Sequence, residues 1–135
     1  MITYTTEETL TVAEFKDVLV RSTLGERRPI DEPDRLQEMI AQADLIVTAR
    51  DNGKLVGVAR SISDFAYCTY LSDLAVDRTY QKQGIGKELI RHTKLTAPQA
   101  TLYLVSAPAA IPYYPRIGME QYEHCYVLRK VEQLK

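Results

Sequence analysis

The chain has 135 residues, of which 45% are hydrophobic and 26% are charged, and its formal net charge is −1. This length suits one domain with a single hydrophobic core, and the near-neutral charge excludes a general electrostatic attraction to nucleic acid or to an anionic membrane. No apolar run approaches the roughly 20 residues that a membrane-spanning helix needs. The first residues lack the basic start and the apolar core of a signal peptide, so we expect a cytoplasmic protein.

Hydrophobic periodicity and turn residues predict an alternation of strands and helices. Thr11 and Glu14 form a capping-box pattern before the first helix, and Asn52-Gly53 is a strong hairpin signal. The expected elements are, in chain order, a strand at Ile2–Tyr4, a helix from Val12 to about Ser22, a loop at Thr23–Pro33, a helix from Asp34 to about Ala43, strands at Leu45–Arg50, Lys54–Ser61 and Ala66–Val76, a helix after Gly84, a strand at Thr101–Ser106, a short segment to Ile117 and a last strand at Tyr122–Leu128. A strand, a helix and a strand in succession predict a parallel pair with a right-handed crossover. The whole chain is expected to form a single mixed α/β domain.

The two cysteines, Cys68 and Cys125, are far apart in the sequence, and no histidine cluster accompanies them. His124 is adjacent to Cys125, but neighbouring residues on a strand point to opposite faces. We therefore expect free thiols and no metal site.

Gln81, Gly84 and Gly86 lie between the apolar run that ends at Val76 and the next predicted helix. Glycine lets the backbone approach an anion closely, and the first N–H groups of a helix can hold a phosphate. A Walker loop would need serine or threonine after Lys87, and a dinucleotide fingerprint would need a third glycine three residues after Gly86. Neither is present, so the sequence predicts a phosphate-binding turn of another kind.

The pattern Gln81-x-x-Gly84-x-Gly86 resembles the acetyl-coenzyme A (acetyl-CoA) motif of the GCN5-related N-acetyltransferase (GNAT) family, Q/R-x-x-G-x-G/A. A second stretch, residues 110–119, resembles the pattern A-x-x-F-Y-x-x-x-G-F of the same family. Tyr113 replaces its phenylalanine, and Met119 replaces its last aromatic residue. The family's functional tyrosine, which follows that phenylalanine in the pattern, corresponds to Tyr114.

The resemblance implies a fold, an activity and a set of cofactor contacts. The fold is a mixed, mostly antiparallel sheet with a splayed parallel pair in the middle and helices on both faces. The activity is direct transfer of an acetyl group from acetyl-CoA, without a metal, to a primary amine of a small molecule or peptide; homodimers are frequent in the family. A non-catalytic acyl-CoA sensor or partner-binding module on the same fold is the alternative. The implied cofactor contacts are Leu74, Ala75, Val76, Gln81, Lys82, Gln83, Gly84, Ile85, Gly86, Lys87, Ser106 and Tyr114.

The resemblance also implies catalytic roles. Tyr114, with an ordinary pKa near about 10, is expected to protonate the leaving thiolate. Some members use a glutamate base six residues before the position of Val76, where this chain has Tyr70. Asp73 is the nearest carboxylate and the candidate for a base or a substrate contact, with water as the default proton route. In a regular strand Asp73 and Tyr70 point to opposite faces, and a bulge would reverse this.

The acceptor pocket is the least specified part of the site. The candidate contacts, which the sequence does not rank, are Arg28, Arg60, Phe65 and His124. The charged residues 26–28 are expected to be solvated loop residues.

Overall fold

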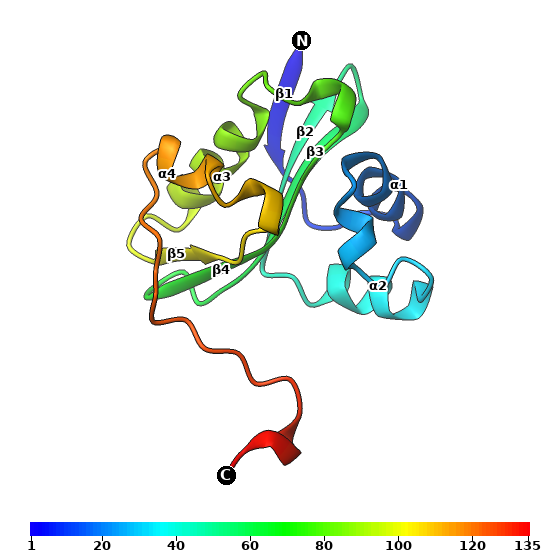
Figure 1. Cartoon of the computed structure of the whole chain (residues 1–135). Helices are drawn as coiled ribbons and strands as arrows, with labels where there is room; N and C mark the ends of the chain where they lie inside the picture. The colour runs from blue at the N-terminus through cyan, green and yellow to red at the C-terminus, as the bar shows by residue number, and fades with distance from the viewer. The chain divides into compact units, whose positions relative to one another are not determined.

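The computed structural model describes all 135 residues, and the chain divides into two compact units, Met1–Val105 and Ser106–Lys135. The first unit contains a five-stranded sheet in the order β1-β2-β3-β4-β5, antiparallel except for the parallel pair β4–β5. Figure 1 shows helices on both faces of this sheet. The elements are β1 (Ile2–Thr6), α1 (Val12–Ser22), η1 (Leu24–Arg27), α2 (Pro33–Ala41), β2 (Leu45–Asp51), β3 (Lys54–Ser63), β4 (Cys68–Val76), η2 (Arg78–Tyr80), α3 (Ile85–Thr96) and β5 (Thr101–Leu104).

Local signals position the first helix and the hairpin as predicted. The Thr11 hydroxyl accepts the Glu14 N–H at 3.1 Å, which satisfies one of the free donors at the start of α1. Asn52 and Gly53 both have positive φ, 49° and 90°, as the tight turn between β2 and β3 requires. The helix α2 has no side-chain cap and begins at Pro33, whose fixed φ suits a first helical position.

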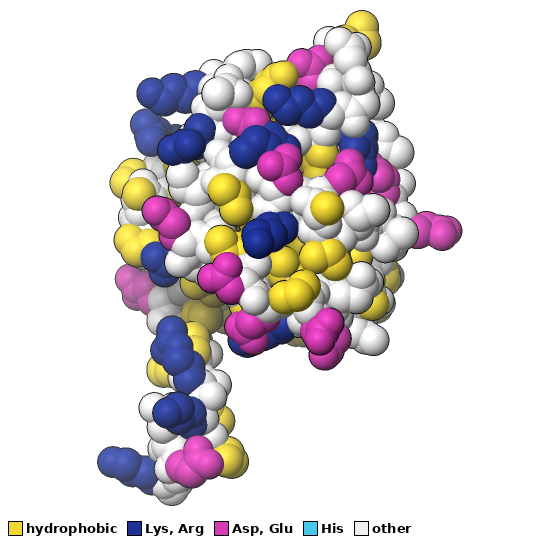
Figure 2. All heavy atoms as spheres, turned by 90° about the vertical axis from the view of Figure 1, so that its right-hand side faces the viewer, with side chains coloured by type: hydrophobic (Ala, Val, Ile, Leu, Met, Phe, Trp, Pro, Cys, Tyr) yellow, Lys and Arg dark blue, Asp and Glu magenta, His cyan; other side chains and the backbone are white.

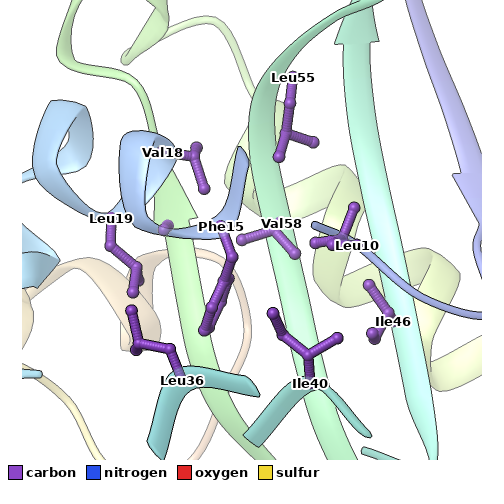
Figure 3. Packing of buried hydrophobic residues seen from close by; sticks show 10 residues of the cluster. Leu10, Phe15, Val18, Leu19, Leu36, Ile40, Ile46, Leu55 and Val58 are labelled. Carbon is purple, nitrogen blue, oxygen red and sulfur yellow. The ribbon is translucent and has the colours of Figure 1, made fainter. Parts of the chain in front are cut away.

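The sheet is sandwiched between two hydrophobic layers. On one face, Phe15, Val18 and Leu19 of α1 and two residues of α2 pack on the sheet. Figure 3 shows these side chains pointing toward one another and toward Val58 of β3. On the other face, Ile85 and Leu89 of α3 pack on residues of β2, β3 and β4. The expected mixed sheet with helices on both faces is therefore confirmed.

The parallel pair is short and lies at the edge of the sheet, not in its middle as expected, because no strand follows β5 in the sheet order. The strand β5 ends at Leu104, two residues before the predicted end, and pairs only with Cys68–Leu71 of β4. The strand β4 continues to Val76 with β3 as its only partner. The strands thus part after Leu71, as the expectation of a splayed pair required.

The second unit contains η3 (Pro108–Ala110), α4 (Tyr113–Arg116) and η4 (Val131–Gln133). The predicted strand at Tyr122–Leu128 is wrong, since this segment forms no strand. Its side chains are exposed, with Tyr126 at 91%. High β-propensity reflects packing against neighbouring strands, and here no partner strand is present.

No helix in the structure combines the length and apolar character needed to cross a membrane. On the face of the molecule drawn in Figure 2, basic and acidic side chains are interspersed. This distribution agrees with the small net charge of −1.

Candidate functional site

The second half of β4 has one paired edge and one open edge. On the β3 side, pairing continues to Val76, opposite Gly57. On the β5 side, pairing stops at Leu71, opposite Leu104. Backbone groups of residues 72–76 that point to the β5 side therefore meet no neighbouring strand. An extended ligand with amide groups can pair with such an edge as an added strand would.

The loop after β4 presents a run of unpaired backbone N–H groups. No acceptor in the chain meets an N–H from Lys82 to Lys87, and the first bond into α3 runs from the Glu88 N–H to the Gly84 carbonyl at 3.1 Å. Lys82 and Gly84 have φ of 65° and 82°, left-handed conformations that occur where successive N–H groups form an anion-binding concavity. We call residues 82–87 the N–H cradle. It includes the N-terminus of α3, the positive end of that helix.

Side chains around the cradle keep its approach open. A Cβ built on Gly84 meets no atom within 4 Å. Lys82 and Lys87 are exposed, so their ammonium groups can reach a bound anion. Gln81 turns back toward the strand, where its Nε2 donates to the Val76 carbonyl at 2.9 Å. This bond ties the open edge to the residue that precedes the cradle.

A partly buried ion pair that the sequence did not predict holds the start of this loop. Asp77 caps η2 by accepting the Thr79 N–H and hydroxyl at 2.8 and 2.9 Å. The Arg21 guanidinium of α1 donates to the other oxygen of Asp77 and to the Leu55 carbonyl, the latter at 2.6 Å. Burial favours the neutral acid, but the hydrogen bonds from Thr79 and Arg21 outweigh it and lower the pKa of Asp77.

Gly57 is a second feature that the sequence analysis missed. A Cβ at this position would lie 3.1 Å from Leu89 Cδ1 and 3.3 Å from Ile85 Cγ2, both on the first turns of α3. Because Gly57 has no side chain, α3 packs closely on β3, beside the end of the open edge. A glycine within a β-rich run is the signal that indicates such a close approach.

Asp73 lies at the bulge that the sequence analysis considered. Arg60 pairs with Asp73 and Ser61 with Leu71, so Ser72 is the extra residue in β4. Asp73 is fully buried, and its two oxygens accept the Nε groups of Arg28 and Arg60. The expectation that Arg28 is a solvated loop residue is therefore wrong, because Asp73 draws it into a partly buried ion pair.

The second unit contains the predicted tyrosine. The Tyr114 carbonyl accepts the Met119 N–H at 3.0 Å, and Gly118 follows α4 with φ of 99°. The Tyr114 ring meets Tyr113 edge to face, with centroids 5.2 Å apart. Burial and the neighbouring Tyr113 raise the pKa of Tyr114. Ser106 donates its hydroxyl to the Ala107 carbonyl at 2.6 Å.

A mostly apolar hollow of about 590 Å³ lies beside the paired part of β4. Ile62, Tyr70 and Tyr103 occupy neighbouring register positions on β3, β4 and β5. The hollow is lined by Ile62, Ser63, Asp64, Cys68, Tyr70 and Tyr103. Asp64 is its one charged residue, and three backbone N–H bonds, from Tyr67, Ala66 and Cys68, lower the pKa of this carboxyl.

The other acceptor candidates are dispersed. Phe65 is partly exposed in the loop before β4, with φ of 59°. His124 lies in the second unit, where its ring meets that of Tyr122 edge to face. Cys68 and Cys125 are free and exposed, and no group of His, Cys, Asp and Glu side chains is arranged to hold a metal ion.

Comparison with solved structures identifies the fold class as that of acetyltransferases. A GNAT family acetyltransferase from Streptococcus pneumoniae superposes with a TM-score of 0.77, at 21% identity, over 96% of this chain and 100% of that one. An aminoglycoside N-acetyltransferase in complex with CoA gives 0.72 at 16% identity, covering 97% of this chain and 95% of that one. A ribosomal-protein-alanine N-acetyltransferase from Brucella melitensis gives 0.73 at 17% identity, over 96% and 99%.

The sequence model of the family described as "Acetyltransferase (GNAT) family" matches residues 12–119. The chain belongs to this family. It is also similar to the histone acetyltransferase TAP1 of Glycine max, 34% identical over 70 residues, and to GCN5-related N-acetyltransferase 2 of Arabidopsis thaliana, 33% identical over 70 residues. Each match covers 50% of this chain but only 30% and 27% of those relatives, so the chain spans less than a third of their length.

Proposed function

We propose that this chain is an N-acetyltransferase that transfers the acetyl group of acetyl-CoA directly to a primary amine of a small molecule or peptide. One observation carries the proposal: the open strand edge at residues 72–76 is followed, after the short connection at residues 77–81, by the N–H cradle. A ligand with an amide-bearing arm and a diphosphate matches this combination, because the edge pairs with amides and the cradle attracts anions. Family membership and the CoA complex of a protein with the same fold support it.

In this proposal, the backbone of residues 74–76 pairs with the pantetheine arm and the N–H cradle surrounds the diphosphate. Lys82 and Lys87 add positive charge from exposed positions. Ser106 is a further proposed cofactor contact. Because main-chain groups make most of these contacts, few side chains need to be specialised for the cofactor.

Tyr114 supplies the proton for the leaving thiolate. Its raised pKa keeps the phenol protonated at neutral pH, so the proton is present when the carbon–sulfur bond breaks. The ammonium group first loses one proton to water, which frees the lone pair that forms the new carbon–nitrogen bond. The nitrogen loses a second proton to water as the carbon–sulfur bond breaks, and water then returns a proton to Tyr114. Asp73 is poorly suited to receive either proton of the amine, since it is fully buried and both of its oxygens are bonded to arginines. Alignment of the two reactants supplies much of the acceleration.

The acceptor binds in the hollow beside Tyr70 and Tyr103. This hollow shares β4 with the open edge, which brings an amine bound there toward the acetyl group. Its apolar walls suit an acceptor with an apolar or aromatic body. The ionised Asp64 offers the charge that an ammonium group prefers on approach.

Calorimetry with CoA and acetyl-CoA tests the cofactor assignment, and a thiol-release screen over amines tests the reaction. We expect micromolar binding of both ligands and amine-dependent release of CoA. Absence of binding would overturn the proposal. Binding without thiol release across a broad panel of amines would instead identify an acyl-CoA sensor.

Gly84→Ala is the sharpest variant for the cradle, and Gly53→Ala is its matched control. Both glycines have positive φ and open space where a Cβ would be, so both variants carry similar backbone strain. We expect Gly84→Ala to weaken CoA binding by about tenfold or more, because its methyl group enters the approach to the cradle. Gly53→Ala should leave CoA binding unchanged. Equal affinities for the two variants would show that the diphosphate binds elsewhere.

A further inference from the structure

We propose that Arg28, Arg60 and Asp73, which we call the arginine clamp, act as positioning residues that fix the bulge at Ser72 and thereby the register of the open β4 edge. The inference rests on the proposed binding of the pantetheine arm along that edge. These three charged side chains are buried or partly buried, and they take part in neither the proposed cofactor contacts nor the proposed proton route. The inference gives them a role.

Both arginines bind the bulge residue itself. Arg28 Nη2 donates to the Ser72 carbonyl at 2.7 Å, and Arg60 Nη2 donates to the Ser72 hydroxyl at 3.1 Å. The next residue, Asp73, accepts the Nε of each arginine on a separate oxygen. The extra residue of the strand is therefore held through its main chain and its side chain at the same time.

The remaining donors connect the clamp to the helical side of the sheet. Arg28 Nη1 donates to the Arg27 carbonyl at 2.8 Å, and Arg60 Nη1 donates to the Met39 carbonyl at 3.1 Å. Every guanidinium nitrogen of both residues thus has a protein acceptor. Three of the five N–H donors of each guanidinium are therefore used within the protein, which favours a structural role over the substrate contacts considered for Arg28 and Arg60.

The position of the bulge decides which backbone groups face the gap beside β5. Leu71 packs in the core on the α3 side, and Ala75 packs in the core on the α1–α2 side. Residues four apart share a face in a regular strand, so the extra residue between them is what places Leu71 and Ala75 on opposite faces. A bulge at another position would turn the intervening N–H and C=O groups from one edge to the other. Pairing with an extended ligand would then be lost along that segment.

Comparing the affinity for whole CoA with the affinity for its nucleotide half distinguishes this role from a general loss of stability. Adenosine 3′,5′-bisphosphate has the nucleotide part of CoA but lacks the pantetheine arm. We expect Arg28→Gln to weaken CoA binding by about tenfold while the affinity for the bisphosphate stays nearly constant. Arg28→Lys, which retains the charge, should recover part of the loss. Arg35→Gln is the matched control, because Arg35 forms an exposed ion pair with Glu32, and it should change neither affinity.

Equal weakening of both ligands by Arg28→Gln, or no weakening of CoA, would overturn the inference. If Arg28→Gln fails to fold, Ser72→Ala removes only the hydroxyl that Arg60 binds and should give a smaller loss that is again specific for CoA. If the unmodified protein does not bind CoA, the proposed function fails. Hydrogen exchange then tests the clamp alone, since Arg28→Gln should accelerate exchange of the amides at residues 72–76 more than those of β2. Unchanged exchange there would refute it.

Discussion

Replacement of Gly57 by alanine tests whether close packing of α3 on β3 holds the N–H cradle in place. The new Cβ would lie 3.1 Å from Leu89 Cδ1 and 3.3 Å from Ile85 Cγ2, closer than ordinary van der Waals contact. Both neighbours are almost fully buried, with exposures of 0% and 3%, so they have little room to move. Overpacking of this kind costs about 2 kcal/mol, or a fall in Tm of roughly 6–10 °C for a chain of this size. CoA affinity should fall with it, because α3 must shift outward.

A double-mutant cycle identifies the contact responsible. Leu89→Val removes the Cδ1 atom that Gly57→Ala would meet, so the two substitutions should compensate in part. We expect the double variant to be less destabilised than the sum of the single variants, measured by urea unfolding. Additive losses in free energy of unfolding would refute the packing argument, since they would show that Leu89 is not the obstacle.

Two further predictions concern single side chains. Tyr114→Phe should lower turnover by about 100-fold and leave CoA binding nearly unchanged, because the ring remains and only the acid is lost; unchanged turnover with an authentic amine would remove Tyr114 from the mechanism. Asp77→Asn should lower the free energy of unfolding by about 1–2 kcal/mol at neutral pH. The folded-state pKa of Asp77 is below its ordinary value of 3.8, so its stabilising contribution is present above that pH and is lost as the pH falls through the folded-state pKa. The difference between the two proteins in urea unfolding should therefore shrink below pH 3.8, and a constant difference would exclude the Arg21–Asp77 pair as its source.

Local sequence signals predicted the elements that depend on local structure. The Thr11 cap and the Asn52-Gly53 turn are short-range devices, and the structure has both. The glycine turn before α3 was also predicted from its residues, because positive φ and unpaired N–H groups follow from the chain itself. These features define the N–H cradle without reference to the rest of the fold.

The features that the sequence did not reveal depend on partners distant in the chain. Arg28 and Asp73 are 45 positions apart, and Arg21 and Asp77 are 56 apart, so no periodicity connects either pair. The predicted strand at Tyr122–Leu128 is wrong because a strand also depends on a distant partner, and here that partner is missing. Its composition favours a strand, but a strand exists only with a neighbour to pair with.

The proposed cofactor site, which is built from the main chain, also predicts an unusual pattern of mutational tolerance. Every residue except proline supplies the same N–H group, so the side chain at an exposed cradle position such as Gln83 is free to vary in size and charge without loss of the donors. The constraint is one of backbone conformation, and it falls on Lys82 and Gly84, whose φ values are positive. We therefore expect that the surface around the proposed cofactor site can be changed extensively by substitution, provided that the path of the backbone through these two positions is preserved.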